Sequence, residues 1–113
     1  MPYIKITSNT QICESERESI KSELGAAIEI FPGKSERWLM ISFESDTPMY
    51  FSGSDEPACM VEVDVFGKVE GKYYDEMTAA ISRIISEGLS ISPERIYTKY
   101  REFDRWGCAD FNF

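Results

Sequence analysis

Residues 58–66, which read Ala-Cys-Met-Val-Glu-Val-Asp-Val-Phe, carry the pattern that decides the fold. Val61, Val63 and Val65 fall on one side of an extended chain, whereas the two acidic residues between them fall on the other. Because successive side chains of a strand point to opposite faces, this alternation predicts a strand that is buried on one face. The apolar face needs other elements of the chain to cover it.

Helical and extended patterns lie on both sides of this strand. Residues 15–31 and 73–89 each place apolar side chains at helical spacing, which predicts two amphipathic helices. Ser15-Glu16-Arg17-Glu18 fits a capping box at the start of the first helix, and Pro32-Gly33 is expected to end it. Further strands are predicted over residues 3–8, 37–46 and 95–103, with room for a very short one at 48–51.

The order of elements is strand, helix, strand, and this order occurs twice. We therefore predict an internal duplication, with pseudo-repeats at about residues 1–46 and 58–103 of a single domain that spans residues 1–113. Right-handed crossovers then place both helices on one face of a four-stranded mixed sheet. The predicted fold class is α+β, with two layers.

The other face of the predicted sheet has no helix to cover it. It carries charged, polar and large apolar side chains together, namely Tyr3, Lys5, Thr7, Trp38, Met40, Ser42, Met60, Glu62, Tyr97 and Lys99. A sheet that is covered on one side only favours association of further copies through the open face. We therefore expect an oligomer.

Composition excludes several classes of protein. The chain has 113 residues, of which 42% are hydrophobic, so it can bury one core and is not wholly disordered. Its net charge of −8 repels phosphate backbones and anionic lipid headgroups, so neither nucleic acid nor a membrane surface is an expected partner. No apolar run is long enough to cross a bilayer and no secretory signal pattern is visible, so we expect a cytoplasmic location.

Few side chains are available as bases or metal ligands. The chain contains no histidine, and Cys13, Cys59 and Cys108 are too far apart in sequence for a CxxC motif. A structural zinc site and a histidine-based triad are therefore not expected, and we predict neither a metal nor an organic cofactor. Proton transfer would fall to carboxylates, lysines, tyrosines, thiols or the chain terminus.

Pro2 is the unusual candidate among these groups. Removal of Met1, which a small second residue permits, would leave a secondary amine at the start of a strand. Burial or a neighbouring lysine lowers the pKa of such an amine, so it can act as a neutral base and take a proton from carbon next to a carbonyl. The alternative is that Pro2 merely allows Met1 to be removed.

Several short segments bear on the family of the chain. It opens with Met-Pro-Tyr-Ile, and Gly33-Lys34 follows the first predicted helix. Further segments of this kind are residues 48–57, 66–68 and 91–97, which read Pro-Met-Tyr-Phe-Ser-Gly-Ser-Asp-Glu-Pro, Phe-Gly-Lys and Ile-Ser-Pro-Glu-Arg-Ile-Tyr. In this order and at this spacing, the segments resemble the macrophage migration inhibitory factor family of the tautomerase superfamily from end to end.

The resemblance implies both an assembly and an activity. Members of this family have a β-α-β duplication and assemble as homotrimers whose sheets line a central channel. They catalyse keto-enol tautomerisation of phenylpyruvate-type acids, and some accept dopachrome analogues. The chain is therefore expected to be a cofactor-independent isomerase that acts on an enolisable arylpyruvate.

The resemblance also implies roles for three central residues. Pro2 would be the catalytic base, Lys34 would bind the substrate carboxylate, and Tyr97 would reach the pocket from the neighbouring subunit. Enolate charge that develops next to a keto acid would then be stabilised by the lysine and the tyrosine hydroxyl. Without the resemblance, Lys34 would be taken to complement a helix dipole and Tyr97 to pack on a strand.

Other positions match the family in part. Ser54 and Phe66 match positions near or lining the pocket, and Trp38 matches an aromatic position at its rim. Lys99 stands where asparagine is common, and a second positive charge near the mouth would strengthen binding of acids or lower the pKa of the Pro2 amine. The aromatic tail at residues 105–113 departs from the family pattern, which leaves the shape of the pocket open.

Two other functions stay open beside the tautomerase. The first is a cytokine-like ligand that binds a protein receptor, carries a vestigial or secondary pocket, and is secreted without a signal peptide. The second is a relative that adds water to unsaturated or halogenated acids, and the arginines usual in those enzymes have no clear match here. A base, a cation and a tyrosine at matching positions favour the tautomerase.

Overall fold

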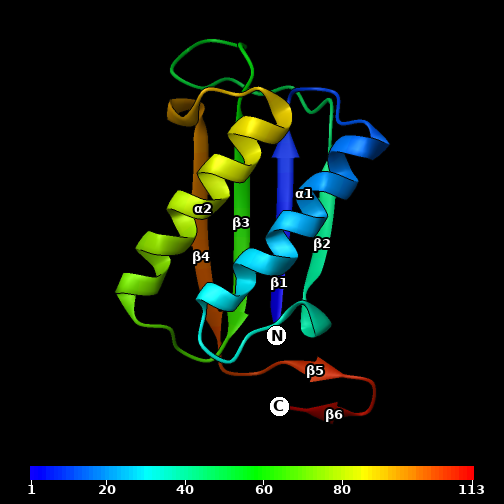
Figure 1. Ribbon diagram of the computed structural model, residues 1–113, viewed down its shortest axis with the longest axis vertical. Coiled ribbons are helices and arrows are strands. Elements are labelled where there is room, and N and C mark those ends of the chain that lie inside the picture. The colour runs from blue at the N-terminus through cyan, green and yellow to red at the C-terminus, as the bar shows by residue number, and fades with distance from the viewer.

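The fold is built on a four-stranded mixed sheet with the strand order β2-β1-β3-β4 (Figure 1). The computed structural model describes the whole of residues 1–113. Its strands are β1 (Pro2–Ser8), β2 (Met40–Glu44), β3 (Cys59–Phe66) and β4 (Ile96–Phe103). Strand β1 runs parallel to β2 and antiparallel to β3, and β3 runs parallel to β4. The predicted sheet is confirmed.

Helices α1 (Glu14–Ala27) and α2 (Gly71–Leu89) lie side by side on one face of this sheet (Figure 1). The side chains between the two layers are almost all aliphatic, and the fully buried ones include Ile4, Ile6, Ile20, Leu24, Val61, Met77, Ile81, Ile84 and Ile85. Each such side chain contributes about 1.5–3 kcal/mol when it leaves water. The apolar faces predicted for the strands and for both helices therefore form one core.

The start of α1 differs from the sequence prediction. The N-cap is Cys13 rather than Ser15, and the backbone N–H of Cys13 donates to the carboxylate of Glu16 at 2.9 Å. Ile12 is only 4% exposed, so the chain enters the core directly before the helix and the helix begins earlier. The α-helix ends at Ala27 and continues as a 3-10 turn over Ile28–Ile30, so residues 15–31 do not form one regular helix.

Strand β2 is shorter than its alternating pattern predicts. Residues Glu36–Trp38 form a 3-10 turn, in which the backbone N–H of Trp38 donates to the carbonyl of Ser35 at 3.2 Å. Trp38 therefore lies beside the sheet and not on its open face, which corrects the prediction. Residues 48–51 form no strand, and only a single bridge joins Phe51 to Ser54.

The tail forms a small hairpin of β5 (Gly107–Cys108) and β6 (Phe111–Asn112). It lies below the sheet at the end where the chain begins, so the two termini are close together (Figure 1). The long loop between β2 and β3 lies at the opposite end of the sheet (Figure 1). None of the helices is long and apolar enough to span a membrane.

The open face of the sheet carries paired charges. The ammonium nitrogen of Lys5 lies 3.2 Å from a carboxylate oxygen of Glu44, and that of Lys99 lies 3.4 Å from a carboxylate oxygen of Glu62. Met40 and Tyr97 on the same face are 67% and 59% exposed, which is high for large side chains of a sheet. The single chain thus leaves a mixed apolar and charged face uncovered.

Candidate active site

The beginning of the chain is fixed at the edge of the core. Pro2 is buried and pairs with Val65 across the β1–β3 ladder. The backbone N–H of Phe66 also donates to the Met1 carbonyl at 3.1 Å, so pairing extends to the first residue. An amine at this point is held by the sheet and does not move as a frayed terminus would.

Lys34 brings a positive charge to this chain end. It follows Gly33, whose φ of +78° turns the chain back toward the sheet, a conformation that glycine adopts without strain. The Lys34 ammonium donates to the carbonyl oxygen of Phe66 at 2.9 Å. Burial, and then the charge of Lys34, lower the pKa of the N-terminal amine of Met1. The Lys34 side chain thus contacts the last residue of β3, to which the chain start is also hydrogen-bonded.

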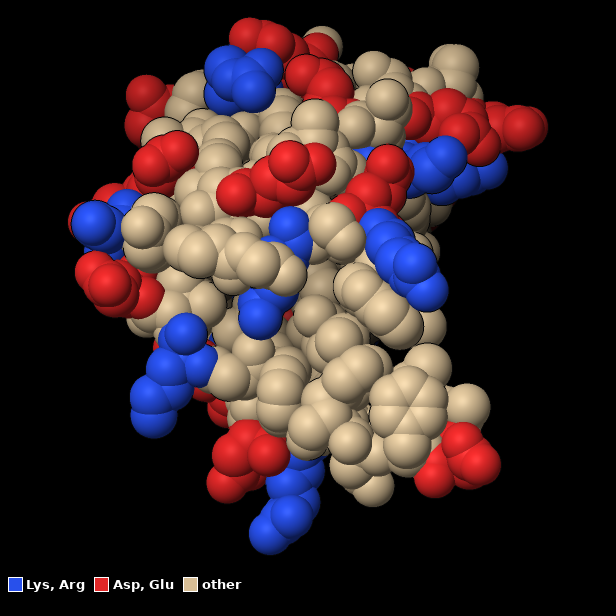
Figure 2. Space-filling model, turned by 60° about the horizontal axis from the view of Figure 1, so that its bottom comes forward, with Lys and Arg blue, Asp and Glu red and all other residues tan.

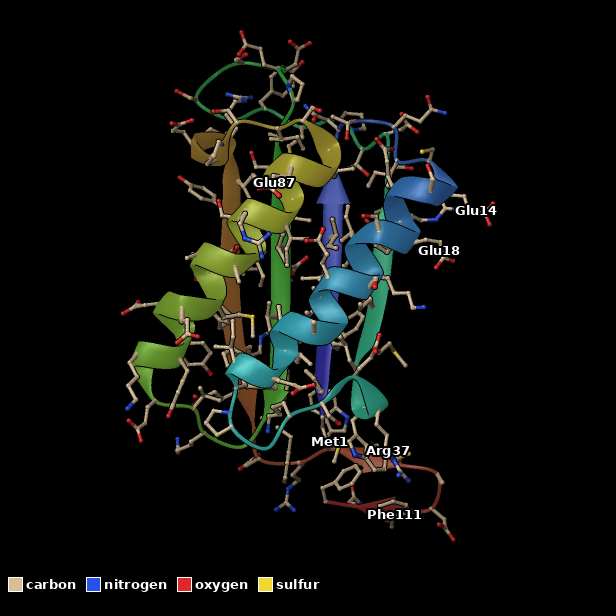
Figure 3. The ribbon with its side chains drawn as sticks, viewed as in Figure 1. Met1, Glu14, Glu18, Arg37, Glu87 and Phe111 are labelled. Atoms are coloured by element: carbon tan, nitrogen blue, oxygen red, sulfur yellow. The ribbon has the colours of Figure 1, made fainter.

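Aromatic rings surround the same end of the molecule. The ring of Phe113 lies 5.7 Å from that of Trp38 and 6.1 Å from that of Phe66, measured between centroids. Phe111 packs on Phe113 at 5.2 Å, and the guanidinium of Arg37 covers the ring of Trp38 at 5.0 Å. Met1, Arg37 and Phe111 are seen near one another at this end (Figure 3). Figure 2, which turns this end forward, shows uncharged surface bordered by charged side chains.

Phe113 is the residue of this cluster that the sequence prediction missed. The aromatic-rich tail indicated that one of its rings could pack near the chain start, but the spacing of the tail does not predict which one. The backbone N–H of Phe113 donates to the carbonyl of Trp106 at 2.9 Å, which closes the hairpin and aims the last residue at Trp38. The short hairpin is therefore what brings residue 113 back beside residue 66.

Three predicted site residues lie elsewhere in the single chain. Tyr97 pairs with Met60 near the start of β3, whereas Pro2 pairs with Val65 near its end, so the length of the sheet separates them. Ser54 lies in the loop beside Tyr97, where its hydroxyl accepts a hydrogen bond from the Glu56 N–H at 3.1 Å. Lys99 lies midway along the open face and is paired with Glu62.

The single chain therefore brings only some of the predicted residues together. Pro2, Lys34, Phe66 and Trp38 gather at one end, with Phe113 beside them. A hollow of about 300 Å³ nearby is lined by Asp64, Phe103, Arg105, Trp106 and Gly107. It does not include the chain start, so the gathered residues form an open corner. No group of three or more His, Cys, Asp or Glu side chains is placed to hold a metal ion.

This corner has the components for proton transfer next to a carboxylate. A lowered pKa favours the neutral, basic form of the chain-terminal amine, and the Lys34 ammonium attracts an anion. Aromatic walls favour a flat, apolar substituent on that anion. The arrangement suits a small aromatic acid that has an acidic C–H.

Comparison with known proteins gives the family of the chain. The family model described as macrophage migration inhibitory factor matches residues 1–111. The macrophage migration inhibitory factor of Meriones unguiculatus is 27% identical over 104 residues, which cover 92% of this chain and 90% of that protein.

Solved structures agree over nearly the full length. MIF2 of Leishmania major superposes with a TM-score of 0.94 at 28% identity, and the match covers 100% of this chain and 97% of that one. The macrophage migration inhibitory factor homologue of Prochlorococcus marinus has a TM-score of 0.83 at 28% identity and covers 98% of each chain. Because the family model and the fold agree from one end to the other, this chain belongs to the macrophage migration inhibitory factor family, with the fold of the tautomerase superfamily.

Proposed function

We propose that the protein is a keto-enol tautomerase in which the amine of Pro2, freed by removal of Met1, is the catalytic base. The observation that carries the proposal is the fixed chain start with Lys34 beside it. Burial and the Lys34 charge lower the pKa of the Met1 amine, and we expect them to act in the same direction on a Pro2 amine one residue further on, which favours its neutral, basic form. Membership of the family supports an activity of this class.

The proposed reaction moves one proton between two sites of the substrate. The Pro2 nitrogen takes a proton from the enol hydroxyl or from the carbon next to the keto group, and the electron pair left behind forms an enolate. The protonated amine then returns that proton to the other site, which balances charge and leaves the amine neutral. Lys34 holds the substrate carboxylate and stabilises the enolate.

The aromatic corner accounts for the proposed substrate class. Trp38, Phe66 and Phe113 offer ring faces next to Lys34, so a carboxylate and an aryl group can bind at the same time. An arylpyruvate such as phenylpyruvate has both groups and an enolisable carbon between them. A dopachrome-type acid shares the carboxylate and the flat ring, and we propose it as a second substrate.

Assembly would complete the site. The open sheet face, with exposed Met40 and Tyr97, is a surface that a further copy can cover. We propose a homotrimer in which Tyr97 of the partner subunit reaches the Pro2 corner, with Ser54 near the same contact. Lys99 would lie at the mouth, where its pairing with Glu62 reduces its net positive charge.

Turnover of enol phenylpyruvate, followed by ultraviolet absorbance, tests this function. Untagged protein whose N-terminus is confirmed by mass as Pro2 is compared with Pro2→Gly and with Pro48→Gly, an exposed proline of the loop between β2 and β3. We expect rapid turnover by the parent and the Pro48→Gly variant, and a large loss in Pro2→Gly. If correctly processed protein shows no turnover, the proposal fails, and a receptor-binding ligand becomes the better-supported function.

A further inference from the structure

The side chain of Arg95 makes four hydrogen bonds to the loop between β2 and β3. Its guanidinium donates to four backbone carbonyl oxygens of the loop, those of Phe51 at 3.0 Å, Ser54 at 3.0 Å, Glu56 at 2.9 Å and Pro57 at 2.8 Å. Arginine has five N–H donors in a fixed plane, so this set uses nearly its whole capacity. Lysine has three donors and no plane, and it cannot replace these bonds.

Two of these bonds fix one tight turn. Phe51 and Ser54 exchange backbone hydrogen bonds at 2.9 and 3.1 Å across Ser52 and Gly53, which both have positive φ. Arg95 donates to the same two carbonyl oxygens, so each of them accepts one hydrogen bond across the turn and one from the guanidinium. Arg95 thus fixes the backbone from which the Phe51 side chain projects.

Asn9 holds the same loop from the other side. Its amide donates to the carbonyls of Asp55 at 3.1 Å and Glu56 at 3.0 Å and accepts from the N–H of Ala58 at 2.9 Å. The carbonyl of Glu56 thus accepts from both Arg95 and Asn9. A loop held in this way is ordered, although it lies outside the core.

The ring of Phe51 is placed between Arg95 and Tyr97. The guanidinium carbon of Arg95 lies 5.3 Å from the centre of the Phe51 ring, and the Tyr97 ring lies 4.7 Å from it, tilted by 55°. Arg95 ends the 3-10 turn that precedes β4, Tyr97 is the second residue of β4, and both side chains contact the same Phe51 ring. Phe51 fills the space between them.

Tyr97 has no other partner in the chain that would hold it. It is 59% exposed, and the tyrosine hydroxyls that make hydrogen bonds within the chain are those of Tyr3, Tyr74 and Tyr100. An exposed tyrosine on a sheet face normally samples more than one rotamer. The packing of Phe51 therefore decides where the Tyr97 hydroxyl points.

We propose that Arg95 is a positioning residue: through Phe51, it fixes Tyr97 so that the hydroxyl is presented to the site of a neighbouring subunit. This inference rests on the proposed function, because it takes Tyr97 to bind substrate there. Arg95 touches no substrate itself. Its effect on activity passes entirely through Tyr97.

A double-mutant cycle tests this path. The chains compared are the parent, Arg95→Lys, Tyr97→Phe and the double variant, with Arg83→Lys on α2 as the matched control because Arg83 only pairs with Glu23 and Glu87 on the surface. We expect Arg95→Lys and Tyr97→Phe each to lower kcat/KM by about tenfold, mainly through KM, with no further loss in the double variant. Losses that multiply would overturn the inference.

A second variant separates positioning from loop stability. Phe51→Leu removes the ring but leaves the four carbonyls for Arg95, so the loop keeps its hydrogen bonds. It is expected to raise KM as Arg95→Lys does and to lose nothing further when combined with Tyr97→Phe. If Phe51→Leu keeps the KM of the parent while Arg95→Lys lowers Tm and activity, Arg95 is merely structural and the inference fails.

A readout without turnover keeps this inference distinct from the proposed function. With 3-fluorotyrosine at position 97 alone, the fluorine resonance of the parent is shifted by the Phe51 ring. Arg95→Lys is expected to move it toward the position of free fluorotyrosine, whereas Arg83→Lys leaves it unchanged. A resonance that does not move in Arg95→Lys overturns the inference. An inactive parent overturns the tautomerase proposal, and the resonance still decides whether Arg95 holds Tyr97.

Discussion

The Lys34 ammonium donates a 2.9 Å hydrogen bond to the carbonyl oxygen of Phe66, the last residue of β3. The N–H of the same Phe66 donates to the carbonyl of Met1, so one residue ties both the cation and the chain start to the sheet. The distance between the ammonium and the terminal amine is thereby set by backbone structure.

Replacement of Lys34 by methionine should weaken substrate binding and keep the terminal amine protonated to higher pH. Without the ammonium, the carboxylate of the substrate loses a charge-assisted partner, and we expect kcat/KM to fall by about tenfold to a hundredfold, chiefly through KM. Lys68→Met is the matched control, because its side chain is 94% exposed. Steady-state kinetics with phenylpyruvate check this, and an unchanged KM in Lys34→Met would remove Lys34 from the site.

The pH dependence of activity should report the lowered pKa of the terminal amine. Because only the neutral amine takes a proton, kcat/KM should rise with pH through a value below the ordinary pKa of an α-amino group and then level off. Lys34→Met should shift this rise to higher pH, because the like charge that disfavours protonation is gone. A rise at the same pH in both proteins would show that Lys34 does not act on the base.

Stability should change over the same range of pH. The folded chain holds the amine at a lower pKa than the unfolded chain, so between the two values the unfolded state binds more protons. The free energy of unfolding should therefore increase as pH rises through this window and become constant above about 8, the ordinary value. Urea denaturation at a series of pH values checks this, and chain acetylated at its N-terminus should show no such increase.

Removal of the last ring should change substrate preference more than stability. Phe113→Ala takes away the ring that packs on Trp38 and Phe66, so we expect KM for phenylpyruvate to rise about fivefold and KM for an aliphatic 2-keto acid to change little. Tyr50→Ala is the control, because Tyr50 is 77% exposed in the loop at the opposite end of the sheet. Equal effects on the two substrates would mean that Phe113 is not a wall of the site.

The three thiols should react at very different rates. Cys13 and Cys108 are exposed, whereas Cys59 is 2% exposed and burial raises the pKa of its thiol to about 12. Because the thiolate is the reactive form, a disulfide reagent at pH 8 should modify two thiols quickly and the third only after unfolding. Cys13→Ser should remove one of the two fast-reacting thiols. Three thiols that react equally fast would contradict the burial of Cys59 in β3.

The sequence predicted the sheet and both helices because their signals are periodic. The valines at 61, 63 and 65 are buried as their alternation requires, and the apolar residues of 73–89 cover them from α2. The first and last residues of the helices and strands were less well predicted, because they depend on competing local hydrogen bonds. Cys13 and not Ser15 caps α1, and the 3-10 bonds around Trp38 remove it from the strand that its alternation suggested.

The candidate site was predicted in part, for a comparable physical reason. Pro2, Lys34, Phe66 and Trp38 come together because the sheet and the turn after α1 determine their places. Phe113 was missed, because a two-residue hairpin strand carries too little pattern to show where the chain end returns. Arg95 gave no sequence signal, since its four acceptors are backbone carbonyls of a loop.

The most direct test of the account is the titration of Pro2 itself. The chain contains five prolines, and in ¹⁵N-proline-labelled mature protein only the terminal secondary amine can titrate, because the others are amide nitrogens. We predict one resonance that titrates below the ordinary pKa of an α-amino group, at the same pH as the rise of kcat/KM. An unshifted pKa, or a rise in activity at a different pH, would contradict the claim that the Pro2 amine is the base.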